Sequence, residues 1–247
     1  MTRVRSSARM ITRPAADDAE PCLFGAACGV YVRIVRLALA EKGVAYRLFE
    51  RDVPELDGPW PDGPQHHSFG RIPAFEHDGF LLYETGAITR YIDEGFAGPA
   101  LQPASPRGRA RMHEVISLLD NCAFQTLIWD IFAERVRAAF EARKPDQQRI
   151  AAALPLAETC LDELVELMDE GPYLAGERVT LADLHAAPMM IYAQMSPEGA
   201  ALVHARPALA TWLSRVRRRS SIADTRTPLE LLAWHSASAA ATARPQA

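Results

Sequence analysis

Two neighbouring residues, Glu84 and Thr85, have polar side chains that could bind charged groups of a ligand. Two short β-prone runs, 73–76 and 80–83, flank an Asp-Gly pair at 78–79, which is a strong hairpin signal. A helical pattern follows, so the pair should lie where strand gives way to helix. Free N–H groups at a helix start attract a carboxylate, and Glu84 can pair with an ammonium. Alternatively, Thr85 is only a helix cap and Glu84 a solvated acid.

The composition is that of an ordinary globular protein. The 247 residues are 49% hydrophobic and 23% charged, with a formal net charge of −4. No basic excess indicates nucleic-acid binding, and no apolar run approaches the roughly 18 residues of a membrane span. We therefore expect a cytoplasmic protein without a nucleic-acid or membrane partner. A solvated helix end, rather than a nucleic-acid patch, is expected at four arginines: Arg215, Arg217, Arg218 and Arg219.

The cysteines and the N-terminus bear on the compartment. Cys22, Cys28, Cys122 and Cys160 lack the spacing of zinc ligands and suit a reducing compartment, so we expect no metal and no disulfide. The Arg- and Ser-rich start has no apolar region, which argues against a secretory signal. It superficially resembles an organelle transit peptide, and a start at Met10 is equally open. We expect disordered tails at 1–20 and 235–247.

The first part of the chain predicts an α/β domain. A strand at 23–24, a strongly apolar helix at 30–42 ending at Gly43 and a strand at 46–50 form a βαβ unit. A Pro- and Gly-rich segment, the hairpin and its helix follow. This order is a thioredoxin-like topology, and we assign it to residues 21–96.

The remainder of the chain predicts helices alone. A Pro-punctuated linker at 97–106 precedes an all-helical domain at 107–234. Apolar residues at helical spacing over 150–168 mark an amphipathic face. Thr180 and Asp183 have the spacing of a capping box, with Asp in place of Glu, so a helix should begin there.

Four segments together resemble the cytosolic glutathione transferases. Residues 23–43 resemble that family's first strand and helix, 70–73 (Gly-Arg-Ile-Pro) its G-K-V-P turn, 83–88 its E-S-x-A-I element, and 174–183 its L-A-G-x-x-x-T-x-A-D segment. The match spans 22–218. It implies a thioredoxin-like domain followed by a helical bundle, glutathione as co-substrate, a role in detoxification and a homodimer.

The resemblance also assigns the glutathione-binding residues. It implies a cis peptide bond between Ile72 and Pro73, with the Ile72 backbone pairing with the cysteinyl part of glutathione as an added strand. Glu84 and Thr85 would hold the γ-glutamyl end. Candidates for the glycyl carboxylate are Arg71 and, less favoured because a His pair in such a loop is usually solvated, His66 or His67.

The residue that activates the thiol departs from the family pattern. Counting back from the end of the first helix places the usual Ser or Cys donor at Gly29, which has no side chain. Three alternatives remain open. Cys28, near a helix start and Arg33, could have a depressed pKa and form a mixed disulfide. The Tyr31 phenol could donate to the sulfur, or the N–H groups of Gly29 and Val30 could suffice.

The second substrate should bind between the turn at 26–31 and the first long helix of the helical domain. Asp120 and Phe124 are our candidates for this pocket, although aromatic residues at helical spacing usually belong to the core. The leading hypothesis is an enzyme in which glutathione thiolate attacks a small hydrophobic electrophile. The alternatives are a non-catalytic scaffold of the same fold, favoured by Gly29, and a glutathionyl reductase that depends on Cys28.

Overall fold

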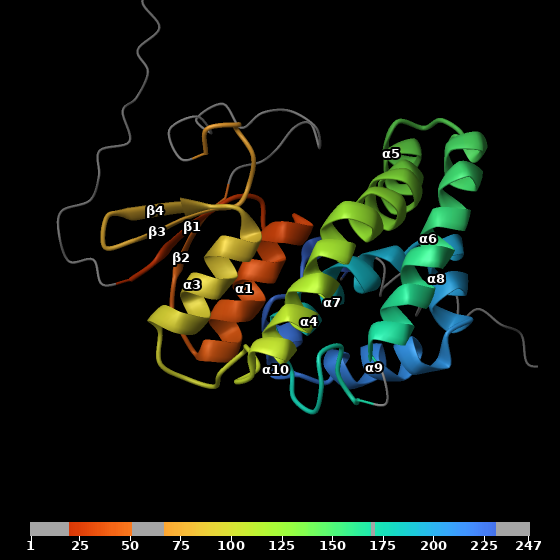
Figure 1. Cartoon of the computed structure of the whole chain (residues 1–247). Helices are drawn as coiled ribbons and strands as arrows, with labels where there is room; N and C mark the ends of the chain where they lie inside the picture. Colours follow the sequence, from red (N-terminus) through yellow and green to blue (C-terminus); the bar gives the residue numbers. More distant parts are fainter. Residues whose placement is uncertain (1–19, 51–66, 169–170, 231–247) are drawn as a thin grey trace, which may run out of the picture.

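The computed structural model describes residues 20–50, 67–168 and 171–230 (Figure 1). The predicted tails, apart from Glu20, and the candidate His66 lie outside these residues.

The N-terminal part of the chain forms one mixed sheet with two helices. The strands have the order β2-β1-β3-β4, in which β1 is parallel to β2 and antiparallel to β3. This is the predicted thioredoxin-like arrangement. α1 and α3 pack together between the sheet and the helical half (Figure 1). The bounds are β1 Cys22–Phe24, α1 Val30–Lys42, β2 Arg47–Phe49, β3 Ala74–His77, β4 Phe80–Tyr83 and α3 Thr85–Gly95.

Local sequence signals explain two of these boundaries. Gly43 ends α1 with φ 67°, a left-handed conformation that favours glycine. Asp78 and Gly79 join β3 to β4 with φ values of 51° and 76°, so both central residues of the turn are left-handed. Such a turn matches the twist of the flanking strands. The predicted hairpin is confirmed.

The C-terminal part is built from helices around a buried central helix, α7. Every residue of α7 is buried, and it contacts α1, α4, α9 and the helix η1. The bounds are α4 Pro106–Leu118, η1 Leu119–Ala133, α5 Glu134–Phe140, α6 Gln147–Met168, α7 Leu181–Ala193, α8 Pro197–His204, α9 Pro207–Arg217 and α10 Ser220–Asp224.

One continuous helical stretch is longer and more apolar than we expected from the sequence. α4, η1 and α5 run without a break, and the stretch Pro106–Val136 is long and apolar enough to cross a membrane by length and composition. Our statement that no run approaches such a span is therefore wrong. Half of its most apolar window is buried inside the protein, and η1 packs against α6 and α7. Core helices meet the same test, so the finding is weak evidence for a membrane.

The start of α7 is fixed by the buried carboxylate of Asp183. Asp183 is fully buried and accepts hydrogen bonds from the backbone N–H groups of Leu174 and Thr180, at 2.9 and 2.7 Å, and from Trp212 Nε1 at 2.7 Å. Burial raises the pKa of Asp183, while these donors act in the opposite direction. The predicted capping box is present. The bond to Trp212 of α9 was not predicted.

Charged side chains of α1 join it to the C-terminal part of the chain. Arg33 is fully buried, and its Nη1 lies 2.6 Å from Glu230 Oε1. At the other end of α1, both Glu41 carboxylate oxygens accept hydrogen bonds from Arg219 at 2.6 Å. The expected solvated cluster at the end of α9 is therefore wrong for Arg219. It is also wrong for Arg215, which donates to the Pro172 carbonyl.

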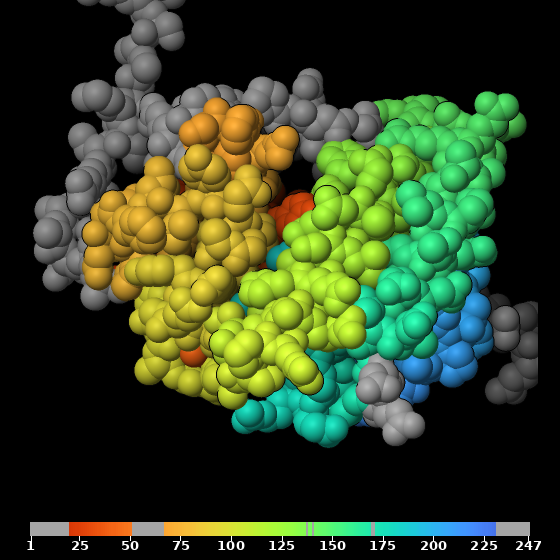
Figure 2. All heavy atoms as spheres, viewed as in Figure 1, coloured from red at the N-terminus to blue at the C-terminus, as the bar shows by residue number. Residues whose placement is uncertain are grey.

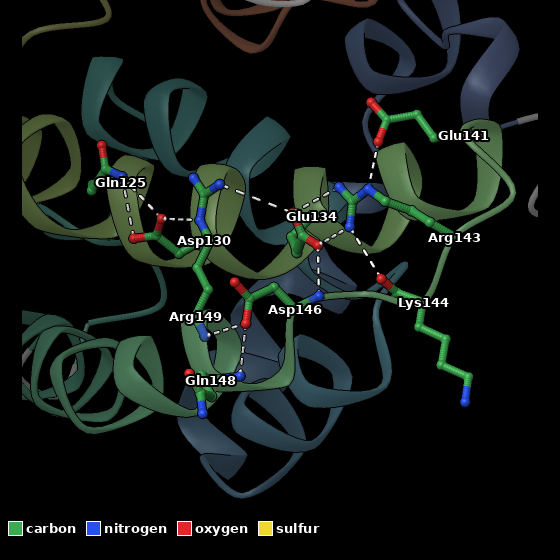
Figure 3. Close-up of polar contacts among 9 residues, drawn as sticks. All are labelled: Gln125, Asp130, Glu134, Glu141, Arg143, Lys144, Asp146, Gln148 and Arg149. Carbon is green, nitrogen blue, oxygen red and sulfur yellow. Dashed lines mark hydrogen bonds and ion pairs between the residues drawn. The ribbon is translucent and has the colours of Figure 1, made fainter.

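A network of charged side chains closes the turn between α5 and α6 (Figure 3). Glu134 is 4% exposed and accepts from Arg143 Nη1 at 2.6 Å and from the Asp146 N–H at 2.7 Å. Nearby, Arg149 Nε donates to Asp130 at 2.9 Å. The Arg143 guanidinium and the Asp146 N–H hold the pKa of Glu134 at about 2.

This network predicts a loss of stability at low pH. Because the folded-state pKa of Glu134 lies below its ordinary value of 4.5, its contribution is complete above pH 4.5 and disappears as the pH falls toward 2. At pH 7, Glu134→Gln should lower the free energy of unfolding by about 1–2 kcal/mol. The difference from wild type should shrink as the pH falls below about 4.5.

Urea unfolding at several pH values measures this difference. Glu163→Gln, an exposed acid on α6, is the matched control and should leave stability nearly unchanged. A Glu134→Gln deficit that stays constant from pH 7 to about pH 3 would contradict the role of the Glu134 charge.

Candidate functional site

The turn before β3 presents a free stretch of backbone. The Ile72–Pro73 peptide bond is cis, as the resemblance implied. Ile72 is half-buried, and in the part of the chain that the structure describes its N–H and C=O have no protein partner. A ligand with a peptide backbone can pair with such groups as an added strand.

Glu84 stands at the start of α3 in an unusual conformation. It occupies the N-cap position with φ 71° and ψ 115°, and its side chain makes no capping bond. A non-glycine residue in this region costs roughly 1–3 kcal/mol, and such residues cluster at ligand sites. Thr85 is the first residue of the helix and is 6% exposed, so it is not the cap. The N–H groups of this first turn point toward the Glu84 end.

His67 is a buried neighbour of Glu84. His67 is 3% exposed, its Nδ1 accepts from the Phe69 N–H at 3.2 Å, and its Nε2 lies 3.8 Å from Glu84 Oε1. Its ring contacts Tyr83 at a centroid distance of 4.5 Å. Burial lowers the pKa of His67. The expectation of a solvated histidine is therefore wrong here. Arg71 is exposed, with its guanidinium 5.8 Å from the Phe69 ring.

Gly29 lies beside the free backbone. It is the N-cap of α1 with φ −65°, and a Cβ at this position would lie 3.6 Å from Ile72 Cδ1. The predicted donor position therefore does face the turn. However, the Gly29 N–H donates to the Ala26 carbonyl at 2.9 Å. Of the two amides that we considered, only Val30, in the first turn of α1, is left free by the helix geometry.

Cys28 does not have the environment that we expected. The residue is exposed, but burial of its thiol raises the pKa, and the nearby Glu50 carboxylate raises it further. The Arg33 guanidinium, expected to lower this pKa, is paired with Glu230 instead. This raised pKa contradicts the predicted depressed one. The Cys28 carbonyl accepts a hydrogen bond from Tyr192 at 2.9 Å.

Tyr31 lies between the two halves of the site. Its ring is 4.5 Å from that of Phe124 and 6.3 Å from that of His185. Burial raises the pKa of the phenol, and the charge of Asp120 with a hydrogen bond to it raises the pKa further, followed by the charge of Glu84. The Tyr31 phenol is therefore close enough to Asp120 for the carboxylate to act on its pKa.

Sequence reasoning missed one residue of this cluster, His185. It is fully buried on α7, and its Nε2 lies 3.2 Å from Asp120 Oδ1. Asp120, whose side chain is 36% exposed, thus contacts a buried histidine and also raises the pKa of Tyr31. The available signal was a histidine two residues after Asp183 within a helix of apolar residues. We had no reason to pair it with a residue 65 positions away.

The wall formed by Asp120 and Phe124 belongs to a π-helix, η1. Pairs five residues apart contact each other, as in the π geometry: Phe124 and Trp129 have ring centroids 6.1 Å apart, and Gln125 donates to Asp130 at 3.1 Å. A π-helix has more residues per turn than an α-helix, so Asp120, Phe124 and Trp129 share one face. π segments often occur at functional sites.

The charges of Asp120, Glu84 and Arg71 all act on the Tyr31 phenol, so these groups lie near one another, and the surface is hollowed between the two halves of the molecule (Figure 2). Figure 2 shows the hollow between gold atoms from the end of the N-terminal part and yellow-green atoms from the first helices of the C-terminal part, with orange-red atoms of the early chain at its floor. Two shallow depressions, of about 200 and 420 Å³, lie elsewhere and contain none of these residues.

Residues that could hold a metal do not gather in the described ranges. Within 20–50, 67–168 and 171–230, no three His, Cys, Asp or Glu side chains are arranged around one point. The four cysteines are all free thiols.

Comparison with known proteins identifies relatives in sequence and in fold. Residues 23–100 match the family "Glutathione S-transferase, N-terminal domain" and 147–215 match "Glutathione S-transferase, C-terminal domain". Glutathione S-transferase F7 of Arabidopsis thaliana is 28% identical over 81% of this chain and 95% of its own length.

Two solved structures share the architecture. Glutathione transferase F7 from Populus trichocarpa superposes with a TM-score of 0.74 and 27% identity, covering 83% of this chain and 97% of its own. A glutathione S-transferase of Methylobacterium radiotolerans in complex with glutathione sulfonate has a TM-score of 0.67 and 26% identity, covering 83% of this chain and 94% of its own.

Proposed function

We propose that this chain, which belongs to the cytosolic glutathione S-transferase family, activates the thiol of glutathione for attack on a small hydrophobic electrophile. The observation that carries the proposal is the free backbone of Ile72 beside the strained Glu84 at the start of α3. A scaffold that does not bind glutathione has no need of either feature. The compartment that suits this reaction is the cytoplasm, where glutathione keeps thiols reduced.

Glutathione would lie along the turn before β3. The N–H and C=O of Ile72, held by the cis bond to Pro73, would pair with the cysteinyl residue. The γ-glutamyl carboxylate would take the N-terminus of α3 and the Thr85 hydroxyl, and its ammonium the Glu84 carboxylate. The complex of the Methylobacterium relative with glutathione sulfonate supports such a ligand.

Arg71 remains our candidate for the glycyl carboxylate, since its guanidinium is exposed. The Nε2 atom of His67 lies 3.8 Å from Glu84 Oε1. His67 is therefore better placed to orient the Glu84 carboxylate than to bind the glycyl carboxylate of glutathione.

Activation of the thiol is best explained by the N-terminus of α1. Cys28 is a poor donor and nucleophile because its pKa is raised, and burial and the Asp120 carboxylate raise the pKa of the Tyr31 phenol, which makes it a weaker donor. The Val30 N–H and the positive end of the helix dipole would stabilise the thiolate without a side chain at Gly29. The second substrate would then bind against Phe124 and Asp120.

Glutathione binding and turnover test this function together. At ten times its Kd, glutathione should stabilise the protein by about 1.4 kcal/mol, seen as a rise in Tm. Conjugation of 1-chloro-2,4-dinitrobenzene should be measurable.

Thr85→Val should raise the Kd for glutathione about tenfold by removing a hydrogen bond. Thr159→Val, at an exposed position on α6, should leave this Kd unchanged.

Each alternative predicts a different result. Binding without turnover of any electrophile would favour the scaffold. Loss of all activity in Cys28→Ser would favour the glutathionyl reductase, whereas our proposal expects that variant to remain active. If glutathione neither shifts the Tm nor retains the protein on an affinity matrix, the enzyme reading fails.

A serine at position 29 should strengthen thiol activation. The backbone of Gly29 has φ −65°, which any residue adopts, and a Cβ would meet Ala26 O at 3.2 Å, so only a small shift is required. Gly29→Ser should add a hydroxyl donor and lower the pKa of bound glutathione by about one unit, whereas Gly29→Ala should not. Ultraviolet titration of the thiolate measures the pKa. Equal values in both variants would contradict this placement of the sulfur.

We also propose a homodimer, because the edge of the N-terminal part is unusually apolar. Phe69 is 69% exposed, and three residues of β4 are also exposed: Phe80, Leu81 and Tyr83. Such a patch on a soluble surface commonly marks an interface, and a second copy would bury it around a two-fold axis.

Substitution of Phe69 tests the dimer. Phe69→Ser should weaken self-association by about tenfold or more, since exposed aromatic residues are common interface anchors. Analytical ultracentrifugation measures the equilibrium. Leu156→Ser, an apolar residue 52% exposed on α6, is the control that should leave the dimer intact. A monomeric wild type at micromolar concentration would overturn the proposal.

A further inference from the structure

We infer that Asp120, held in place by His185, is the hydrogen-bond acceptor for the second substrate, and that the site prefers aromatic electrophiles carrying a hydroxyl or N–H group. This inference rests on the proposed function and goes further by naming the substrate class. It depends on the Asp120–His185 pair, on the aromatic wall beside it and on the exposure of the carboxylate.

The Asp120 carboxylate is held by a buried histidine and is itself partly exposed. His185 Nε2 lies 3.2 Å from Asp120 Oδ1, and His185 is fully buried whereas the Asp120 side chain is 36% exposed. A surface acid without such a partner samples several rotamers. The buried imidazole therefore gives Asp120 a defined direction from the wall of the site.

The second ring nitrogen of His185, Nδ1, indicates that the bond between His185 and Asp120 costs free energy of folding. His185 Nδ1 is buried and has no hydrogen-bond partner within the described residues. With the Nε2 proton donated to Asp120, Nδ1 is an acceptor left without a donor, which costs free energy. A histidine that served only to fill the core could be replaced by an apolar residue without that cost. Its presence is explained if the bond to Asp120 is used.

The surfaces around Asp120 are aromatic. The Tyr31 and Phe124 rings are 4.5 Å apart at the centroids, and Trp129 meets Phe124 edge-on at 6.1 Å. The π geometry of η1 places Asp120, Phe124 and Trp129 on one face. Flat conjugated molecules stack favourably on such rings. A substrate ring on this wall would place a polar substituent against the carboxylate.

Asp120 retains the capacity to bind a further donor. A carboxylate has about four lone-pair sites, and Asp120 accepts from His185 and interacts with Tyr31. A substrate without a donor would cover the carboxylate and strip its water without replacing the lost hydrogen bond. Sites of this kind discriminate against the analogue that lacks the donor.

The test uses two enones that differ only at the donor, 4-hydroxychalcone and 4-methoxychalcone. In both, the glutathione thiolate forms a C–S bond at the β-carbon, the C=C electrons move to the carbonyl oxygen, and water protonates the α-carbon. The thiol proton and the solvent proton balance, so no oxidant or reductant takes part. The two para substituents have similar electronic effects, so the ratio of kcat/KM values, corrected for uncatalysed addition, reports the contact.

We expect wild type to favour the hydroxy compound about tenfold, mainly through KM. Asp120→Leu should reduce this ratio to about one. Asn121→Leu, an exposed neighbour on η1, should leave the ratio unchanged. His185→Leu should reduce the ratio part of the way by raising KM for the hydroxy compound, and circular dichroism should show that both variants are folded.

Three results separate the possible failures. Turnover of both enones by wild type with a ratio near one would overturn this inference and leave the proposed function standing. Equal losses for both enones in Asp120→Leu would also overturn it, because Asp120 would then act only through the structure of the site. No turnover of either enone or of 1-chloro-2,4-dinitrobenzene would instead defeat the proposed function.

Discussion

The geometry of the proposed site depends on the buried carboxylate of Asp183, which contacts none of the site residues. Asp183 binds the amides before α7 and the Trp212 indole, which fixes the central helix in position and rotation. Two residues later, α7 presents His185 to Asp120; at its far end, Tyr192 donates to the Cys28 carbonyl at the start of α1. Both sides of the hollow are thus set by the same helix. Removal of the Asp183 charge would therefore disturb two parts of the site that share no direct contact.

α1 is the second element on which both halves rely. Its N-terminus faces the proposed sulfur position, while Arg33, Glu41 and Lys42 bind groups outside its own turns, including Glu230 and the Asp93 carbonyl. Buried ion pairs add little net stability, because desolvation offsets their attraction, but breaking one is costly. The Arg33 and Glu41 pairs fix the orientation of α1 relative to the helical half, and Lys42 fixes it relative to α3. A donor supplied by a helix terminus, rather than by a flexible side chain, needs that rigidity.

Prediction from the sequence succeeded where the signal was local. The Asp78–Gly79 turn, the end of α1 at Gly43 and the capping box at Asp183 each follow from a few adjacent residues with defined backbone preferences. The π geometry of η1 was not predictable, because its composition also suits an α-helix and the hydrogen-bond register depends on packing. Arg219 pairs with Glu41, 178 residues away, and His185 pairs with Asp120, 65 residues away. Sequence spacing predicts contacts only between residues that are near each other in the chain.

The same distinction separates the two halves of the proposed site. The glutathione-binding half is encoded in one short stretch, from Arg71 to Thr85, so its residues keep their relative positions whenever the hairpin forms. The electrophile half joins α1, η1 and α7, where a single substitution can change the surface without disturbing a turn or a cap. Asp120 can therefore vary without altering a turn or a helix cap, although its loss would leave the buried His185 Nε2 unpaired, whereas Ile72 and Glu84 are tied to backbone geometry. On this reasoning, specificity for the second substrate is carried by η1, and binding of the first is carried by the turn and hairpin that precede α3.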